Sequence, residues 1–191
     1  MSMIEETVVV LGLSLEIFGA MECQGSLVAK IEKKQLLVFC AILAAGQALA
    51  LGIGNFLSTF LSRHEIQAKE IFLGQAVAAA IFLFLGIRLL VKAWRNERIV
   101  ERREEAFQVK RFLRIYSKGI LFTFLAGIAL GFLGGSIPVL LALTLLLTTL
   151  VTVIGMYTGY RLGFEHKMKA YVLGGLLLIA GSMDVVFRYM G

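Results

Sequence analysis

The feature that most constrains this chain is a series of long apolar segments, each separated from the next by a short cluster of charged residues. The segment from Leu36 to Leu61 contains no charged side chain. A helix needs about 20 consecutive apolar residues to cross the hydrocarbon core of a bilayer, and this segment exceeds that length. The segments lack the alternation of apolar and polar residues that is typical of membrane barrel strands. The pattern therefore predicts helices that cross a membrane.

Six segments of this kind occur along the chain. They cover residues 4–29, 36–61 and 71–91, then two spans within 119–160, and finally 170–190. Gly134, Gly135, Ser136 and Pro138 mark a turn between the fourth and fifth spans. We expect an all-α integral membrane protein with six transmembrane helices, folded as a single membrane domain over residues 1–191. The first segment lacks the basic start and the cleavage site of a signal peptide, so we expect it to remain in the mature protein.

The composition excludes several other classes of protein. The chain is 59% hydrophobic and 17% charged, whereas a soluble domain has about 45–50% apolar and about 25% charged residues. This content excludes a disordered chain, and two cysteines are too few for a disulfide-rich scaffold. The net charge of +6 does not indicate a nucleic-acid-binding protein, because the chain has too many apolar residues for that class. Because the sequence has no nucleophile–base pair, phosphate-binding loop or C-x-x-C motif, we do not expect an enzyme.

Lysine and arginine residues lie mostly on one side of the predicted membrane domain. With six spans, the loops 30–35, 92–118 and 161–169 share one side, and both termini share the other. The first side carries fifteen basic residues, namely Lys30, Lys33, Lys34, Lys92, Arg95, Arg98, Arg102, Arg103, Lys110, Arg111, Arg114, Lys118, Arg161, Lys167 and Lys169. The second side carries three, namely Arg63, Lys69 and Arg188. Since Lys and Arg concentrate in the cytoplasm, we expect these loops to be cytoplasmic and both termini to lie outside the cell inner (plasma) membrane.

The longest loop is strongly basic, and apolar side chains such as Phe107, Phe112 and Tyr116 are interleaved with its later basic residues. It is either a solvated connector or an amphipathic stretch that lies on anionic lipid. We expect residues 94–118 to form a cytoplasmic basic linker.

Small residues recur four positions apart in three of the spans. The rows are Gly46, Ala50 and Gly54, then Gly127, Gly131 and Gly135, and then Gly155, Gly159 and Gly163. Such rows let helix backbones approach closely in lipid. We therefore expect a tight bundle with little room for a large pore.

Five residues in the first two spans are candidates for a cation site. A charge at the middle of a span costs about 2.5–3.5 kcal/mol, which makes Glu16 a functional candidate. If the first two helices pack as antiparallel neighbours, Glu16 faces Gln47, and Cys23 faces Cys40 nearer the cytoplasm. Glu22 adds a carboxylate at that inner level. Carboxylate and amide oxygens suit a cation such as Mn²⁺, and thiols suit a softer one.

These candidates also have structural interpretations. Cys23 and Cys40 can pack as small apolar residues. A protonated Glu16 can bond to the amide of the second span and only lock two helices together. His64 and His166 lie in predicted loops, where neither has a metal-ligand partner at suitable spacing.

A second group of polar residues lies towards the outer face. Asn55, Gln75 and Asp184 have similar depths in their spans. They form either an outer vestibule or, for Asp184, a salt bridge with Arg188 one turn later. Arg88 lies close enough to the cytoplasmic end to extend its guanidinium into the interface and needs no function.

Three stretches of the chain carry a family resemblance. Gly12-Leu-Ser-Leu-Glu16-Ile-Phe18-Gly-Ala20 looks like a G-x-S-x-D-A-F-A signature, and Leu85-Gly86-Ile-Arg88-Leu resembles an L-G-G-R-M stretch. Leu173-Gly174-Gly175-Leu-Leu-Leu-Ile179 resembles the start of the same family's last helix. The chain thus resembles the MntP-type manganese efflux pump family of the LysE transporter superfamily. The resemblance implies secondary export of a divalent cation, with Mn²⁺ as substrate, no permanently bound cofactor, and Glu16 as the central ligand.

The resemblance also implies two repeats of three helices, residues 4–93 and 119–191, each opening with an acidic element whose Asp binds the metal. Glu16 keeps the charge of the first Asp, but Phe122 stands where the second belongs. Gln47 replaces a Glu that is typical of the second span. One carboxylate leaves a dehydrated divalent cation uncompensated.

Three functions are therefore open at this point. The first is export of a divalent cation through a site that has moved to include Glu22, Cys23 and Cys40. The second is a non-transporting membrane paralogue that docks a partner or lipid through residues 92–118. The third is a carrier of a different small solute, with Phe122 lining the pocket. Self-association into a homo-oligomer is also open.

Overall fold

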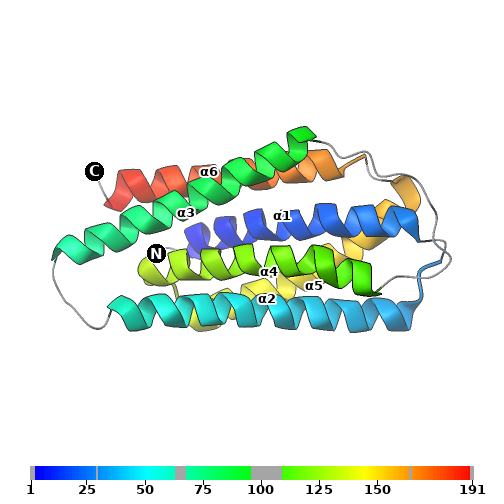
Figure 1. Ribbon diagram of the computed structural model, residues 1–191, viewed down its shortest axis with the longest axis horizontal. Coiled ribbons are helices and arrows are strands. Elements are labelled where there is room, and N and C mark those ends of the chain that lie inside the picture. The colour runs from blue at the N-terminus through cyan, green and yellow to red at the C-terminus, as the bar shows by residue number, and fades with distance from the viewer. Residues whose placement is uncertain (1–2, 29, 63–67, 96–108, 164, 190–191) are drawn as a thin grey trace.

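The computed structural model describes residues 3–28, 30–62, 68–95, 109–163 and 165–189. These residues form six helices and no strand, which confirms the all-α expectation (Figure 1). The helices are α1 (Met3–Leu27), α2 (Lys33–Ser62), α3 (Ala68–Arg95), α4 (Val109–Phe132), α5 (Ile137–Leu162) and α6 (Lys167–Tyr189).

The helix ends follow local sequence signals. Gly134 adopts a φ of 70° in the tight turn after α4, and Ser136 is the N-cap of α5, with Pro138 in its first turn. Gly163 ends α5 with a φ of 75°, and its N–H donates to the Gly159 carbonyl at 3.0 Å. Glycine takes such positive φ values without a side-chain clash, so the predicted turn lies where the sequence placed it.

The described helices extend into the predicted linker between the halves. Helix α3 continues to Arg95 and α4 already begins at Val109, although both ends fall within the stretch 94–118 that was expected to be linker. Residues 96–108 lie outside the described residues, and the expectation of lipid or partner docking through this loop lies mostly there.

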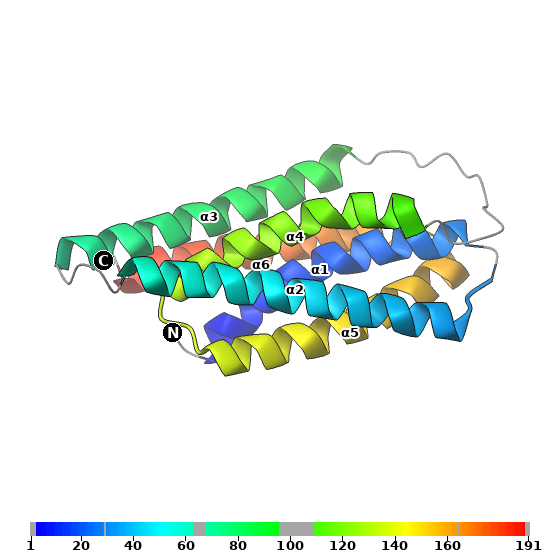
Figure 2. The same ribbon diagram turned by 60° about the horizontal axis from the view of Figure 1, so that its bottom comes forward.

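All six helices run along the long axis of one bundle (Figures 1 and 2). The start of α1 and the end of α6 lie at the same end of the bundle, together with the end of α2, the start of α3 and the α4–α5 turn (Figure 1). The other end holds the ends of α1, α3 and α5, so successive helices run in opposite directions.

Each helix packs mainly against helices of the other half of the chain. Helix α1 packs against α5 and α6, α2 against α4 and α5, and α3 against α6 and α4. In the described part of the chain, helices of the same half touch one another little. The core between the halves includes Val9, Leu51, Phe82, Leu130 and Leu178. The two halves therefore interdigitate.

The predicted glycine rows are sites of close helix approach. A Cβ added to Gly127 would lie 2.4 Å from the Leu51 carbonyl oxygen, and one on Gly159 would lie 2.0 Å from the Glu22 carbonyl oxygen. Such distances exclude any side chain. The rows on α4 and α5 thus let α2 and α1, respectively, pack backbone to backbone, which confirms the expectation of a tight bundle.

Four helices are long and apolar enough to cross a membrane. They are Lys33–Leu61 in α2, Phe72–Arg95 in α3, Ile137–Leu162 in α5 and Lys167–Arg188 in α6. Large apolar side chains on their outer faces are exposed, for example Leu49, Phe56, Phe84, Leu146 and Leu176. The apolar part of α4, Gly119–Phe132, is shorter. Helix α1 carries four glutamates and lies among the other helices. The protein is thus a multi-pass membrane protein.

Candidate functional site

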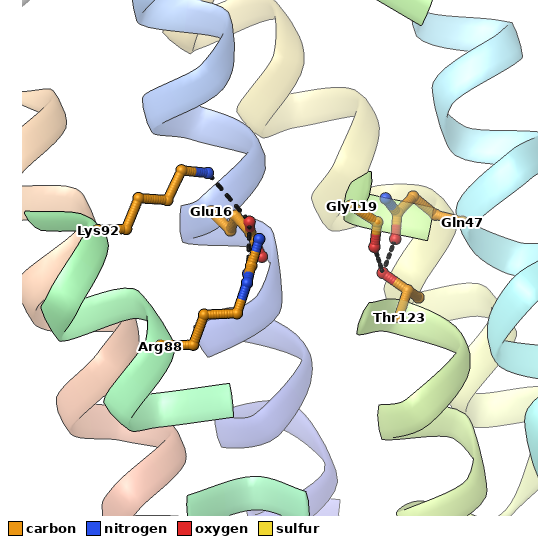
Figure 3. A network of polar contacts seen from close by, with 6 residues as sticks. All are labelled: Glu16, Gln47, Arg88, Lys92, Gly119 and Thr123. Atoms are coloured by element: carbon orange, nitrogen blue, oxygen red, sulfur yellow. Dashed lines mark hydrogen bonds and ion pairs between the residues drawn. The ribbon is translucent and has the colours of Figure 1, made fainter. Parts of the chain in front are cut away.

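Glu16 lies at the centre of a charged cluster between α1 and α3. Its Oε1 atom accepts a hydrogen bond from Arg88 Nη1 at 2.8 Å and a second from Lys92 Nζ at 3.1 Å (Figure 3). The Glu16 side chain is only 11% exposed. Arg88 and Lys92 are four residues apart on α3, and this spacing puts both on one face of the helix. The Glu16 carboxylate thus accepts hydrogen bonds from two positively charged side chains.

Aromatic rings from the second half of the chain complete the cluster. The Arg88 guanidinium carbon lies 3.3 Å from the centroid of the Phe122 ring on α4, and Lys92 Nζ lies 4.6 Å from the Tyr171 ring on α6. Both contacts are cation–π interactions. Phe122, which stands where the resemblance expects an Asp, therefore contacts the same arginine as Glu16.

Gln47 belongs to a separate network. Its Oε1 accepts a hydrogen bond from the Thr123 hydroxyl on α4, and Thr123 Oγ1 also lies 3.2 Å from the Gly119 carbonyl oxygen (Figure 3). The prediction that Glu16 faces Gln47 is therefore wrong. It assumed that α1 and α2 are neighbours, whereas α4 and α5 each pack against both and separate them. The glycine rows bring α5 against α1 and α4 against α2, so α1 and α2 each lie closer to these helices than to one another.

Glu22 lies fully buried near the end of α1. Its Oε1 accepts a hydrogen bond from the backbone N–H of His166 at 2.9 Å, and His166 Nδ1 lies 3.6 Å from the same oxygen. His166 directly precedes α6, and its carbonyl accepts the N–H of Ala170. The Glu22 carboxylate thus lies at the N-terminus of α6, where negative charge is favoured. His166, predicted to have no suitable partner, contacts Glu22 across the fold.

The two cysteines are free and do not pair as predicted. Cys40 is buried and packs with Leu36 and Met156, while Cys23 is half-buried on α1. Since α1 and α2 are not packed side by side, the predicted register between Cys23 and Cys40 is not formed. For Cys40, packing as a small apolar side chain describes its environment.

The three residues assigned to an outer vestibule have different surroundings. Asn55 is buried and lies against Gly131 of α4, and its Nδ2 has no hydrogen-bond partner among the residues that the structure describes. Gln75 is half-buried on α3 and Asp184 is exposed on α6. Arg188 donates to Glu5 of α1, so the salt bridge given as one alternative for Asp184 is not the ion pair that Arg188 forms among the described residues.

Sequence reasoning missed the partners of Glu16. We expected Arg88 to extend towards the membrane interface, but its guanidinium pairs with Glu16. An unpaired carboxylate inside the bundle would cost more free energy than the restricted side-chain conformation of Arg88. Lys92 was counted only among the basic loop residues. The spacing of these two cations by one helical turn on an otherwise apolar segment is the signal that could have indicated them.

A preformed metal centre is not visible in the part of the chain that the structure describes. There, no three His, Cys, Asp or Glu side chains gather where they could hold a metal ion. Glu16, Glu22, Cys23, Cys40 and Gln47 therefore do not form one coordination shell.

Comparison with known proteins gives one consistent result. The family described as "Putative manganese efflux pump" matches residues 30–186. Proteins named "Putative manganese efflux pump MntP" are similar over nearly their whole length. The protein of Proteus mirabilis is 27% identical over 100% of this chain and 96% of its own, and that of Photorhabdus laumondii is 25% identical over 100% and 96%. The protein of Mannheimia succiniciproducens is 24% identical over 99% and 98%.

No solved structure matches the chain. The family match covers most of the sequence and includes Arg88, Lys92 and Phe122, and the full-length relatives extend the similarity over α1 and Glu16. The chain therefore belongs to the MntP family of manganese efflux pumps.

Proposed function

We propose that this protein exports a divalent metal cation, Mn²⁺, by secondary transport, with Glu16 as the residue that receives the cation. Membership of the family, together with a buried carboxylate retained at position 16, is the observation that carries the proposal. A carboxylate oxygen is a suitable ligand for Mn²⁺. The substrate is the cation itself, and no resident cofactor is needed.

The proposed architecture has six transmembrane helices arranged as two inverted three-helix repeats. Exchanging α1 with α4, α2 with α5 and α3 with α6 reproduces the main set of packed helix pairs, and the members of each exchanged pair run in opposite directions (Figure 1). Inverted repeats of this kind place the substrate site between the two halves. In this protein Glu16 comes from the first half and Phe122, its counterpart, from the second.

The proposed orientation puts both termini outside the plasma membrane. The ends of α1, α3 and α5 share one end of the bundle (Figure 1), and this end carries most of the basic loop residues of the sequence. Positive charge concentrates on the cytoplasmic side. Cations would then enter from the end that holds Lys92 and leave at the end that holds Ser136.

The test of export is Mn²⁺ transport into inside-out vesicles that contain the purified protein. Wild-type protein is expected to accumulate Mn²⁺, and Glu16→Gln is expected to lose at least about 90% of the rate because the amide cannot neutralise the cation. Glu32→Gln, which changes an exposed carboxylate at the start of α2, is the matched control and should transport normally. Equal transport by the wild type and Glu16→Gln would rule out the assigned role.

A second candidate function is transport of a small organic solute. Two positively charged side chains and two aromatic rings surround the single carboxylate. These side chains would also suit a solute that carries an anionic group. The same vesicles distinguish the two, because a solute carrier would bind an organic substrate and show no saturable uptake of Mn²⁺.

A further inference from the structure

The charges around Glu16 do not balance. Arg88 and Lys92 both donate to Glu16 Oε1, so the three side chains together carry one excess positive charge. A divalent cation that approaches this oxygen meets two positive groups already on it. In a medium of low dielectric constant this repulsion is large, so the arrangement seen here cannot be the one that holds the cargo.

The two cations differ in how firmly they are held. Arg88 Nη1 is 2.8 Å from Glu16, the Arg88 side chain is 22% exposed, and its guanidinium lies against Phe122 at 3.3 Å. Lys92 Nζ is 3.1 Å from Glu16, its side chain is 36% exposed, and it lies one turn closer to the end of α3 at Arg95. Arg88 is wedged between a carboxylate and a ring, whereas Lys92 has a flexible stem and access to solvent.

The lysine ammonium also contacts an aromatic ring in the position where it bonds Glu16. The Tyr171 ring lies 4.6 Å from Lys92 Nζ, and an aromatic face attracts an ammonium without neutralising it. Lys92 can therefore leave Glu16 and keep its contact with Tyr171, which removes one of the two positive groups from Glu16 Oε1.

We propose that Lys92 is a tethered competitor of the transported cation. Its ammonium binds Glu16 while no cargo is bound, withdraws towards solvent with the Tyr171 ring still beside it when Mn²⁺ takes the carboxylate, and returns to expel the cation. This inference rests on the proposed function and adds to it a residue that sets cargo affinity and release. Lys92 is thus a specificity-determining residue and not a ligand.

The test is Mn²⁺ titration of the purified protein in detergent. Lys92→Gln removes the competing charge and is expected to bind Mn²⁺ roughly tenfold more tightly than wild type. Lys92→Arg keeps the charge and should stay within about twofold of wild type. In vesicles, Lys92→Gln is expected to lower KM and also to lower the maximal rate, because release no longer has a returning ammonium behind it.

A second readout follows the ammonium itself. Mn²⁺ should raise the reactivity of Lys92 towards an amine-acylating reagent severalfold, and Glu16→Gln should show the raised reactivity without Mn²⁺. These two changes require displacement and would not follow from a lysine that only stabilises the fold.

The outcomes separate this inference from the proposed function. If wild type binds Mn²⁺ and Lys92→Gln binds it equally or more weakly at an unchanged melting temperature, the competitor role is wrong while export stands. A lower melting temperature and weaker binding in Lys92→Gln, both restored in Lys92→Arg, would show a structural role instead. If wild type itself binds no Mn²⁺, the proposed function fails and the inference fails with it.

Discussion

Glu6 and Glu22 each lie at the N-terminus of a neighbouring helix. Glu6 accepts hydrogen bonds from the backbone N–H of Ser136 at 2.9 Å and from its hydroxyl at 3.3 Å, and Glu22 accepts the N–H of His166. Ser136 precedes α5 and His166 precedes α6. The free N–H groups and the dipole of a helix N-terminus stabilise a carboxylate there. These two buried acids therefore have a structural role, which leaves Glu16 as the α1 carboxylate for cargo.

We expect Glu22→Gln to lower the free energy of unfolding by about 1–2 kcal/mol, because the amide cannot supply the negative charge that the α6 N-terminus stabilises. Thermal denaturation in detergent would measure this loss. Glu6→Gln should show a loss of similar size, and Glu32→Gln, whose carboxylate is exposed at the N-terminus of α2, should show a smaller one. A Glu22→Gln protein as stable as wild type that no longer responds to Mn²⁺ would instead return Glu22 to the metal site.

At the scale of the helices, small residues decide which elements become neighbours. The Gly127 backbone lies against Leu51 of α2, and the Gly159 backbone lies against Glu22 of α1. Apolar burial gives little drive for association between helices that are already in lipid, so close backbone contact and packing must provide it. The glycine-containing faces of α4 and α5 therefore determine the pairings α2–α4 and α1–α5 more than the order of the helices in the chain does.

We expect Gly127→Ala to destabilise the protein by about 1–3 kcal/mol, because the added methyl would lie 2.4 Å from the Leu51 carbonyl oxygen and force α2 and α4 apart. Gly119→Ala is the matched control on the same helix. Nothing lies within 4 Å of its added Cβ, so it should be neutral or stabilising by up to about 1 kcal/mol. Melting temperatures of both variants check this, and equal effects would contradict the assigned contact.

At the scale of the molecule, the two ends of the bundle differ in charge. One end holds the α4–α5 turn with Ser136, and the other holds the α5–α6 connection with Glu165 (Figure 1). Among the described residues, the second end carries most of the basic side chains that lie at helix ends, including Lys33, Arg95 and Lys169. The bundle should therefore insert in a single orientation.

We expect Ser136→Cys, in a background that lacks Cys23 and Cys40, to react with a membrane-impermeant maleimide on intact cells. Glu165→Cys should react only after the membrane is opened, because positive charge keeps its end in the cytoplasm. Both positions are exposed in the bundle, so a difference in labelling reports the membrane side. The reverse labelling pattern would invert the proposed direction of transport.

The sequence predicted the elements well and their neighbours poorly. The apolar segments, the turn at Gly134 and the glycine rows all reflect local or periodic patterns, and the helices follow them. The predicted pairing of Glu16 with Gln47 assumed that helices adjacent in the sequence pack together, and in this bundle they do not. Arg88 and Lys92 reach Glu16 across the fold. The one-turn spacing of Arg88 and Lys92 shows that they share a face of the helix, but it does not show which helix that face contacts.

The interdigitated halves have a consequence for synthesis of the protein in the cell. Helix α1 leaves the ribosome first, yet Glu6 and Glu22 bond to residues that precede α5 and α6. Until those helices are made, the two α1 carboxylates lack the N–H groups that donate to them in the folded protein. The first helix to be translated thus acquires its native partners only when nearly the entire chain has been inserted.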